Sequence, residues 1–468
     1  MGGLLLMALV TYYFCFLNYG PGGTLSGGDS AKFATLMLEG GVPHTPFYPL
    51  YLLLLRLWRH ATFLFDPAAQ GALLSAFLVA GGLVFLWDFL RRQSNEWLFS
   101  FIAVFICGTA PFFVTAGSEI NPVALSIFLF FLALNLSFSS APLFAAGSIW
   151  GLLFFHDPLA LWFGALFLPL LFILAVRQKG YKEALLALLA LFVVGLLPYL
   201  FTIFSATRPG PKEYLISEKL FATLGKGILN GQFWANYFVY PLSELKERTI
   251  NQAALLGNLC GLSVALSFPI LLLGFCFRKK NGFFFFGTVL FLAAALASFL
   301  FCVPNFHFYN AQWAWLFQCV IALFLAISLH NIATFKAGRI FLWPLFFLVL
   351  LAFPIGFSKN YPKNRQNLHA AAELAHLYGS LPVKSALLCE DIYLVSEVYS
   401  YYKVYMPLMT PDDVVITSSL IPERPNFFWT EAILNVVKEQ KIPYQIYLQV
   451  GETPIYSLGT VSHENKGK

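Results

Sequence analysis

The chain has 468 residues, of which 59% are hydrophobic and only 11% are charged, and its mean hydropathy is +0.71. Because soluble globular proteins carry about 25% charged residues, this composition excludes a water-soluble particle of this size. The formal net charge of +6 comes from small clusters of Lys and Arg between apolar runs. Such clusters are typical of topology signals beside a lipid bilayer, and we expect no nucleic-acid partner.

Eleven apolar runs are candidate transmembrane helices, since a span needs about 20 predominantly apolar residues. They cover residues 4–18, 70–90, 97–115, 122–138, 142–155, 159–176, 184–204, 256–277, 283–301, 312–329 and 340–357. The first run has no basic segment before it and no cleavage site of small residues, so we expect a retained helix and not a signal peptide. Residues 48–58 form a shorter apolar run that contains Arg56, which predicts a helix along the membrane surface.

The basic clusters fix a predicted orientation. Four of them follow the second, sixth, eighth and tenth runs, and they fall on one face if the N-terminus is cytoplasmic and there are eleven spans. These clusters are Arg91 and Arg92; Arg177, Lys179 and Lys182; Arg278, Lys279 and Lys280; and Lys336 and Arg339. The opposite, non-cytoplasmic face then receives residues 19–69, 116–121, 156–158, 205–255 and 303–311, together with the C-terminus.

From residue 358 the composition becomes polar. Residues 385–389 and 414–417 read as strands, and 366–377 and 430–440 read as amphipathic helices. The sequence therefore predicts a polytopic α-helical membrane unit over residues 1–357, with an outer loop at 19–69. It also predicts a small soluble, extracytoplasmic α/β domain over residues 358–468, which is large enough to fold.

The outer loop holds the most informative residues. Asp29 follows two glycines, and Lys32 and His44 come soon after it. A carboxylate in this position suits a tight turn or a helix N-terminus. The three groups together also offer an acid–base group and cations for phosphate.

Two further turns bring ionisable groups to the same face. Glu119 lies between the third and fourth runs, and His156 and Asp157 lie between the fifth and sixth. Each of these residues alone is compatible with an ordinary solvated turn. Their convergence with the first loop on one face favours a site, because ionisable groups at membrane depth are usually functional.

A family resemblance begins at these residues. Gly28-Asp29-Ser30-Ala31-Lys32-Phe33, followed after about ten residues by Val42-Pro43-His44-Thr45-Pro46-Phe47-Tyr48-Pro49-Leu50-Tyr51, resembles a motif of the protein O-mannosyltransferase-like branch of the GT-C membrane glycosyltransferases. Segments 116–125, 151–156, 381–391 and 409–414 resemble later landmarks of that branch in the same order. The chain departs from the motif at Lys32, where the family has an acidic residue, and at Thr45 and Phe47, within the family's P-P-G.

The resemblance implies a GT-C-like fold and transfer of a sugar, of hexosyl or mannosyl type, from a polyprenyl-phosphate donor. The acceptor would be a protein, lipid or glycan hydroxyl on the outer face, and the displacement would invert the anomeric centre. Asp29 is then the expected general base, and Glu119 orients the acceptor or assists the base. The expected substrate-binding residues are Lys32, His44, Tyr48, Arg56, His156 and Asp157.

Two other functions stay open at this point. A transporter or flippase of a lipid-linked or small polar substrate also has many spans, although its charges normally lie near the bilayer midplane. A non-catalytic envelope-assembly scaffold is compatible with the change at Lys32. No compact set of Asp, Glu and His predicts a metal site, so we expect no cofactor and a metal-independent reaction. The expected location is a bacterial cytoplasmic membrane, with the C-terminal domain periplasmic or extracellular, although an endoplasmic reticulum membrane with a luminal active face would give the same sequence pattern.

Overall fold

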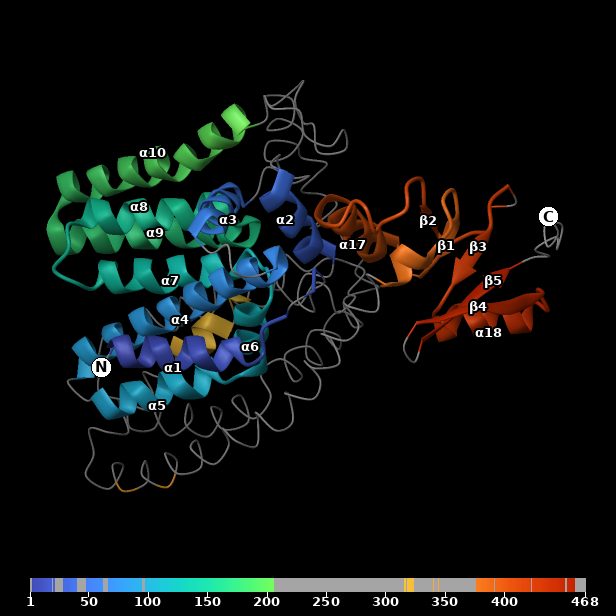
Figure 1. Ribbon diagram of the computed structural model, residues 1–468. Coiled ribbons are helices and arrows are strands. Elements are labelled where there is room, and N and C mark those ends of the chain that lie inside the picture. Colours follow the sequence, from blue (N-terminus) through green and yellow to red (C-terminus); the bar gives the residue numbers. More distant parts are fainter. Residues whose placement is uncertain are drawn as a thin grey trace.

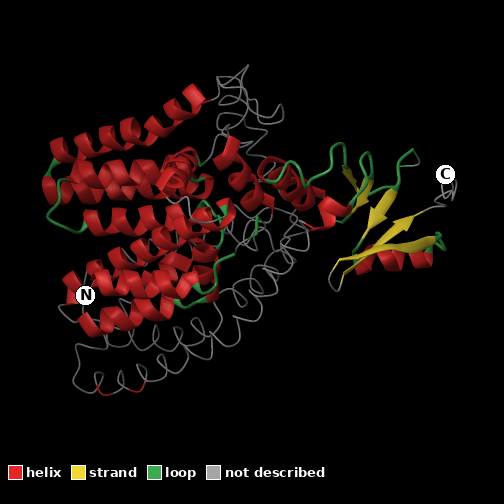
Figure 2. Ribbon diagram, viewed as in Figure 1, coloured by secondary structure: helices red, strands yellow, loops and turns green. Residues whose placement is uncertain are grey.

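The computed structural model is mostly helical, with one small sheet near the C-terminus (Figures 1 and 2). It describes residues 2–18, 20–21, 28–39, 48–61, 66–94, 97–205, 315–316, 318–323, 340, 344, 376–390, 392–421, 423–450 and 453–458. Ten helices fill the N-terminal part that is described. They are α1 (Gly2–Phe14), α2 (Gly28–Glu39), α3 (Pro49–Ala61), α4 (Pro67–Ser94), α5 (Trp97–Gly108), α6 (Pro111–Ser118), α7 (Val123–Ser137), α8 (Leu143–His156), α9 (Pro158–Lys179) and α10 (Tyr181–Ser205).

These helices include long apolar ones. Within the described residues, Pro67–Arg92 and Tyr181–Leu200 are long and apolar enough to cross a bilayer, and the bent pair of α6 and α7 makes a possible third span. Shorter apolar helices occur at Gly2–Phe14, Leu143–His156 and Phe167–Arg177. The first seven predicted runs thus all fall on helices, whereas most of the last four lie outside the described residues, so the count of eleven spans stays a prediction.

Prolines set the breaks between helices. Residues 97–115, predicted as one span, form two helices, because the chain is extended at Ala110 and Pro111 opens α6. Proline has no N–H to offer and is favoured at the first position of a helix. A second break separates α6 from α7, which are bent by 115°. It begins at the extended residue Glu119 and ends at Pro122.

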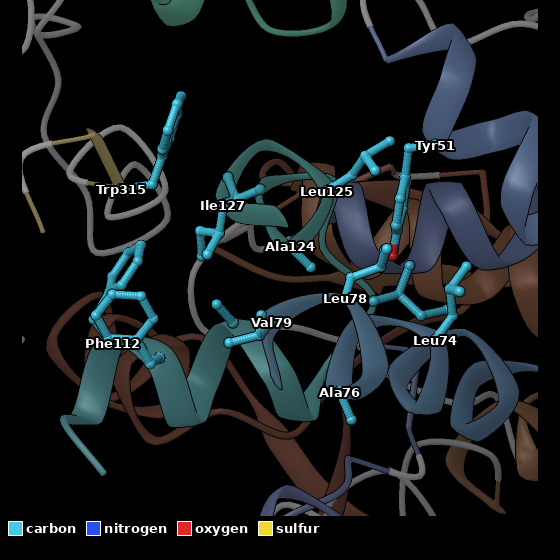
Figure 3. Packing of buried hydrophobic residues seen from close by; sticks show 14 of the residues in the cluster. Tyr51, Leu74, Ala76, Leu78, Val79, Phe112, Ala124, Leu125, Ile127 and Trp315 are labelled. Carbon is cyan, nitrogen blue, oxygen red and sulfur yellow. The ribbon is translucent and has the colours of Figure 1, made fainter. Parts of the chain in front are cut away.

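The helices pack around one apolar core. Buried side chains of α3, α4, α6 and α7 meet there, and Figure 3 shows Tyr51 beside Leu74, Leu78 and Leu125. The α8 and α10 backbones approach closely, because α8 presents glycines to α10. A Cβ atom at Gly147 or Gly151 would overlap the α10 backbone at Ala187 or Leu191. Small residues at such positions are the usual device for close helix packing in membranes.

Helices α2 and α3 lie in the segment predicted as the first outer loop. Asp29 lies in the first turn of α2, where the helix dipole favours a negative charge. Arg59 of α3 donates to the Leu38 carbonyl at 2.7 Å and the Met37 carbonyl at 3.3 Å, near the C-terminus of α2. Helix α3 buries Tyr51, Leu52 and Leu55, and its other face is more exposed, as expected of an amphipathic helix.

The C-terminal part is an α/β unit. Its described residues form five strands, which are β1 (Ala386–Leu388), β2 (Val415–Thr417), β3 (Asn426–Phe428), β4 (Tyr444–Val450) and β5 (Thr453–Leu458), in the sheet order β2-β1-β3-β5-β4. β1 pairs in parallel with β2 and β3, while β5 pairs antiparallel with β3 and β4. Strands β1 and β2 and helix α18 (Glu431–Glu439) fall within the predicted elements.

A second helix of this unit, α17 (Ile392–Tyr405), packs against α2. Figure 1 shows the two helices side by side, where the C-terminal unit meets the N-terminal bundle. The Tyr401 hydroxyl also donates a 2.8 Å hydrogen bond to Asp66 Oδ1, just before α4. The α/β unit is therefore joined to the helix that carries Asp29.

Candidate active site

The outer segments singled out in the sequence meet around the break between α6 and α7. The Ser30 hydroxyl of α2 donates to the Ile120 carbonyl at 2.7 Å. The backbone N–H of Asn18, beyond the end of α1, donates to the Ser118 carbonyl at 2.7 Å. Because Ser30 follows Asp29 and Ile120 follows Glu119, the hydrogen bond between Ser30 and Ile120 brings the backbones of the two expected catalytic residues together.

A buried polar network holds the break in place. The Tyr51 and Ser75 hydroxyls lie 2.9 Å apart, and the Asn121 amide donates to the Tyr51 oxygen at 3.0 Å. The Asn121 side chain accepts from the Val123 amide at 2.9 Å and so satisfies a free N–H in the first turn of α7. Buried polar groups need such partners. Sequence reasoning singled out none of these side chains as a group, since their partners are far apart in the chain.

The turn between α8 and α9 joins the same cluster through Tyr48. The Tyr48 amide donates to the His156 carbonyl at 3.0 Å, and the two rings meet edge to face with centroids 5.3 Å apart. Phe33 of α2 packs edge to face on both Tyr48 and Tyr51. Four of the expected site positions, Asp29, Tyr48, Glu119 and His156, thus belong to one packed region.

The two expected catalytic carboxylates have different surroundings. Asp29 is partly exposed in the first turn of α2. Glu119 is only 3% exposed and has extended backbone, with φ −134° and ψ 162°. A partly exposed carboxylate can meet an incoming hydroxyl, whereas a buried one suits the fixing of a neighbouring group.

Lys32 lies one helical turn after Asp29 and is buried. Its ammonium nitrogen is 3.7 Å from Glu397 Oε1 of α17, and the two side chains are 6% and 11% exposed. Sequence reasoning missed Glu397, because no local pattern relates α17 to the first loop. The cation expected to meet a donor phosphate therefore has an internal carboxylate partner.

His156 and Asp157 are both fully buried, but their side chains do different things. The His156 Nε2 atom lies 3.4 Å from the Pro122 carbonyl, which can only accept, so this nitrogen is the one that carries hydrogen. Asp157 caps α9, because one carboxylate oxygen accepts from the Leu159 and Ala160 amides, at 2.9 and 3.2 Å. Its other oxygen accepts from the Ser126 hydroxyl at 2.9 Å.

The remaining expected site residues are Arg56 and His44. Arg56 lies on α3 and is partly exposed, while His44 lies outside the described residues. The residues that are described contain no group of three His, Cys, Asp or Glu side chains placed to hold a metal ion.

One apolar cavity, of about 80 Å³, lies between α7, α8, α9 and α10, away from this cluster. It is lined by residues such as Trp150, Leu168 and Phe172, and none of its lining side chains is ionisable.

Electrostatics at the junction with the C-terminal unit centre on Asp66. Burial raises the pKa of the Asp66 carboxyl above its ordinary value of 3.8, although hydrogen bonds from Tyr401 and from the Ala69 amide act in the opposite direction. Burial and the nearby Asp66 also raise the pKa of the Tyr401 phenol. The hydroxyl therefore keeps its proton and can donate to Asp66 over the whole physiological pH range.

No protein-family model matches the sequence, and no curated protein sequence matches it. Solved structures do share its architecture. ArnT from Cupriavidus metallidurans bound to undecaprenyl phosphate aligns over 97% of both chains, with 11% identity and a TM-score of 0.55. The chain has the ArnT fold. ArnT in its apo state aligns over the same shares of both chains, with 11% identity and a TM-score of 0.50.

The likeness to ArnT confirms the GT-C-like fold that the sequence predicts. The described residues also include helices that are long and apolar enough to cross a membrane, in agreement with the predicted polytopic membrane unit. Membership of the protein O-mannosyltransferase-like branch stays a prediction, since ArnT is a different GT-C glycosyltransferase.

Proposed function

We propose that this chain is an integral-membrane glycosyltransferase that moves a sugar from a polyprenyl-phosphate donor to an acceptor hydroxyl on the non-cytoplasmic face. The observation that carries the proposal is the meeting of α2, the α6–α7 break and the α8–α9 turn in a chain with the ArnT fold. ArnT is a GT-C glycosyltransferase, and one of its crystal structures is bound to undecaprenyl phosphate. The proposed donor belongs to the same lipid class.

In the proposed reaction the acceptor oxygen attacks the anomeric carbon as the bond from that carbon to the phosphate oxygen breaks. The acceptor proton passes to the Asp29 carboxylate, because a general base must lie within hydrogen-bond reach of the proton that it removes. The displacement is a single step and inverts the anomeric centre. The polyprenyl phosphate leaves with the bonding electrons.

The leaving phosphate gains negative charge and needs a cation. Lys32 is the nearest in sequence to Asp29, and His44 and Arg56 are the other proposed cations. Glu119, which is buried beside the hydrogen bond between Ser30 and Ile120, would orient the acceptor or assist the base. We place this chemistry on the outer face of a bacterial cytoplasmic membrane, with the N-terminus inside and the C-terminal unit outside.

The test is transfer of radiolabelled sugar from polyprenyl-phosphate donors into membranes that contain the protein. Wild type should incorporate label, and the labelled product identifies the acceptor as protein, lipid or glycan. Asp29→Asn should lower the rate by about 10²- to 10⁴-fold, the usual contribution of a general base, and Glu119→Gln should lower it less. Asp412→Asn, which neutralises an exposed carboxylate of the C-terminal unit, is the matched control and should stay active.

Two results would count against the proposal. An Asp29→Asn variant with wild-type activity would remove Asp29 from the role of base. Folded, inserted wild-type protein that transfers no sugar from any donor would favour transport or a scaffold role instead.

A further inference from the structure

The ion pair between Lys32 and Glu397 joins the two parts of the chain at the proposed site. Lys32 belongs to α2, which also carries Asp29, and Glu397 belongs to α17 of the C-terminal unit. Figure 1 shows that these helices lie side by side, at the junction of the bundle and the α/β unit. Glu397 therefore reaches the first outer segment from a different part of the fold.

The position of Lys32 on α2 links it to the reaction. Residues three apart in a helix are neighbours on one face, so Lys32 and Asp29 project from adjacent positions of the same helix. A phosphate bound to the Lys32 ammonium would bring the attached anomeric carbon near Asp29. An anion that already pairs with the Lys32 ammonium, as Glu397 does, would consequently compete with the donor phosphate and lower the affinity for the donor.

The geometry of the pair favours an exchangeable contact. Strong charge-assisted hydrogen bonds between nitrogen and oxygen are about 2.7–2.9 Å long, whereas the Lys32 nitrogen is 3.7 Å from the Glu397 oxygen. A buried ammonium still requires an anion close by, because removing one partner of a buried ion pair leaves a charge without compensation. Glu397 meets this requirement through a long contact that an incoming anion can replace.

We propose that Glu397 is the resting counter-ion of Lys32 and that the phosphate of a polyprenyl-phosphate donor displaces it on binding. This inference rests on the proposed function, since it concerns the donor phosphate of that reaction. The exchange involves no covalent change: the ammonium leaves one anion for another, and the Glu397 carboxylate turns toward the solvent. Glu397 is thus a positioning residue, and the C-terminal unit is part of the donor site.

The proposal predicts the direction of a change in affinity. Glu397→Gln removes the competing carboxylate, so it should tighten binding of a phosphate about three- to tenfold, because apparent affinity rises with the fraction of sites that are ready to bind. A residue that only stabilised the fold would give the opposite sign or no change. Lys32→Met removes the cation and should weaken binding about tenfold or more.

The experiment measures binding of a C55 polyprenyl phosphate without sugar to the full-length protein in lipid nanodiscs. The uncharged polyprenol and inorganic phosphate are parallel probes. Polyprenol should bind all variants equally. Tightening seen with both phosphates would assign the exchange to the phosphate itself, and tightening confined to the lipid form would show that the prenyl chain is also needed.

Asp412→Asn is the matched control, since it removes one carboxylate from an exposed ion pair with Lys403 in the same unit and should leave binding unchanged. Glu397→Asp, which shortens the side chain and keeps the charge, replaces Glu397→Gln if that variant does not fold, and it should tighten binding less. Unchanged or weaker phosphate binding by a folded Glu397→Gln or Glu397→Asp variant would overturn the counter-ion assignment.

These results separate the two proposals because the assay involves no sugar transfer. Tighter phosphate binding by Glu397→Gln in a protein that transfers no sugar would support the counter-ion and refute the transferase. Sugar transfer by wild type with no gain in binding by the variant would do the reverse.

Discussion

Replacing Asp157 tests whether this residue caps a helix or binds substrate. In the structure its carboxylate accepts from the amides of Leu159 and Ala160 and from the Ser126 hydroxyl, in a fully buried position. Asp157→Ala removes the N-cap of α9, which is worth about 1 kcal/mol. It also leaves the buried Ser126 hydroxyl without this acceptor, at a cost of about 1–3 kcal/mol. The free energy of unfolding should therefore fall by about 2–4 kcal/mol.

Asp157→Asn separates the cap from the charge. The amide oxygen can still accept from the Leu159 and Ala160 N–H groups, and its NH₂ group can donate to the Ser126 oxygen. The loss of stability should then be about 1 kcal/mol or less. The free energies are measured by denaturant unfolding in detergent micelles, with Ser148→Ala, an exposed hydroxyl bonded within its own helix, as the control with little change.

Two results would refute this reasoning. If Asp157→Asn were as unstable as Asp157→Ala, the negative charge would matter more than the cap. If Asp157→Ala kept its stability and lost only sugar transfer, Asp157 would return to the substrate-binding residues predicted from the sequence.

The remaining predictions concern helix packing and the junction with the C-terminal unit. Gly151→Leu should prevent α8 from meeting α10, because even a Cβ would overlap the α10 backbone at Leu191, with a loss of about 1–3 kcal/mol or more. Thermal unfolding checks this, and Gly3→Leu, at an open position, should be neutral. Tyr401→Phe removes the hydrogen bond to Asp66 and should weaken the packing of the C-terminal unit on the bundle by about 1 kcal/mol of free energy. Limited proteolysis after residue 376 should then be faster than in wild type, and a wild-type rate would contradict the role given to this hydrogen bond. Since burial raises the pKa of Asp66, the contribution of this carboxyl to stability should be greatest below its ordinary pKa of 3.8 and should fall as the pH rises through the raised value. A pH series of unfolding on wild type and Asp66→Asn measures it, and identical profiles would refute the assignment.

Much of the membrane part could be predicted from local sequence. Apolar runs placed α4 and α9 to within a few residues, and Pro67 and Pro158, with which these helices begin, were a further signal for their first residues that the prediction did not use. The meeting of the first loop with the turns at Glu119 and His156 also followed from topology, because turns on one face of a bundle lie near one another. The break at Pro111 had a visible signal, and reading residues 97–115 as one span gave hydropathy too much weight over the chemistry of proline.

The position of α17 was beyond local reasoning. Its β-branched and aromatic residues favour a strand by propensity, and tertiary packing overrides this preference. Its buried side chains Val395, Val398, Tyr401 and Tyr402 recur at helical spacing, which is the signal that could have identified the helix. Nothing in the sequence, however, relates Glu397 to Lys32, because the contact depends on how two distant segments pack.

The contact between α2 and α17 also affects how the protein can be made. Lys32 of α2 and Glu397 of α17 are 365 residues apart (397 − 32), so a ribosome must synthesise most of the chain before α17 exists. Until then the nascent protein has the face of α2 that carries Lys32 uncovered, without its eventual carboxylate neighbour. The site is completed only after the C-terminal segment has reached the same side of the membrane as α2. If a chain inserted its last segments in the wrong orientation, α17 could not reach α2. The site would then stay incomplete, even if every helix were inserted in the membrane and stable.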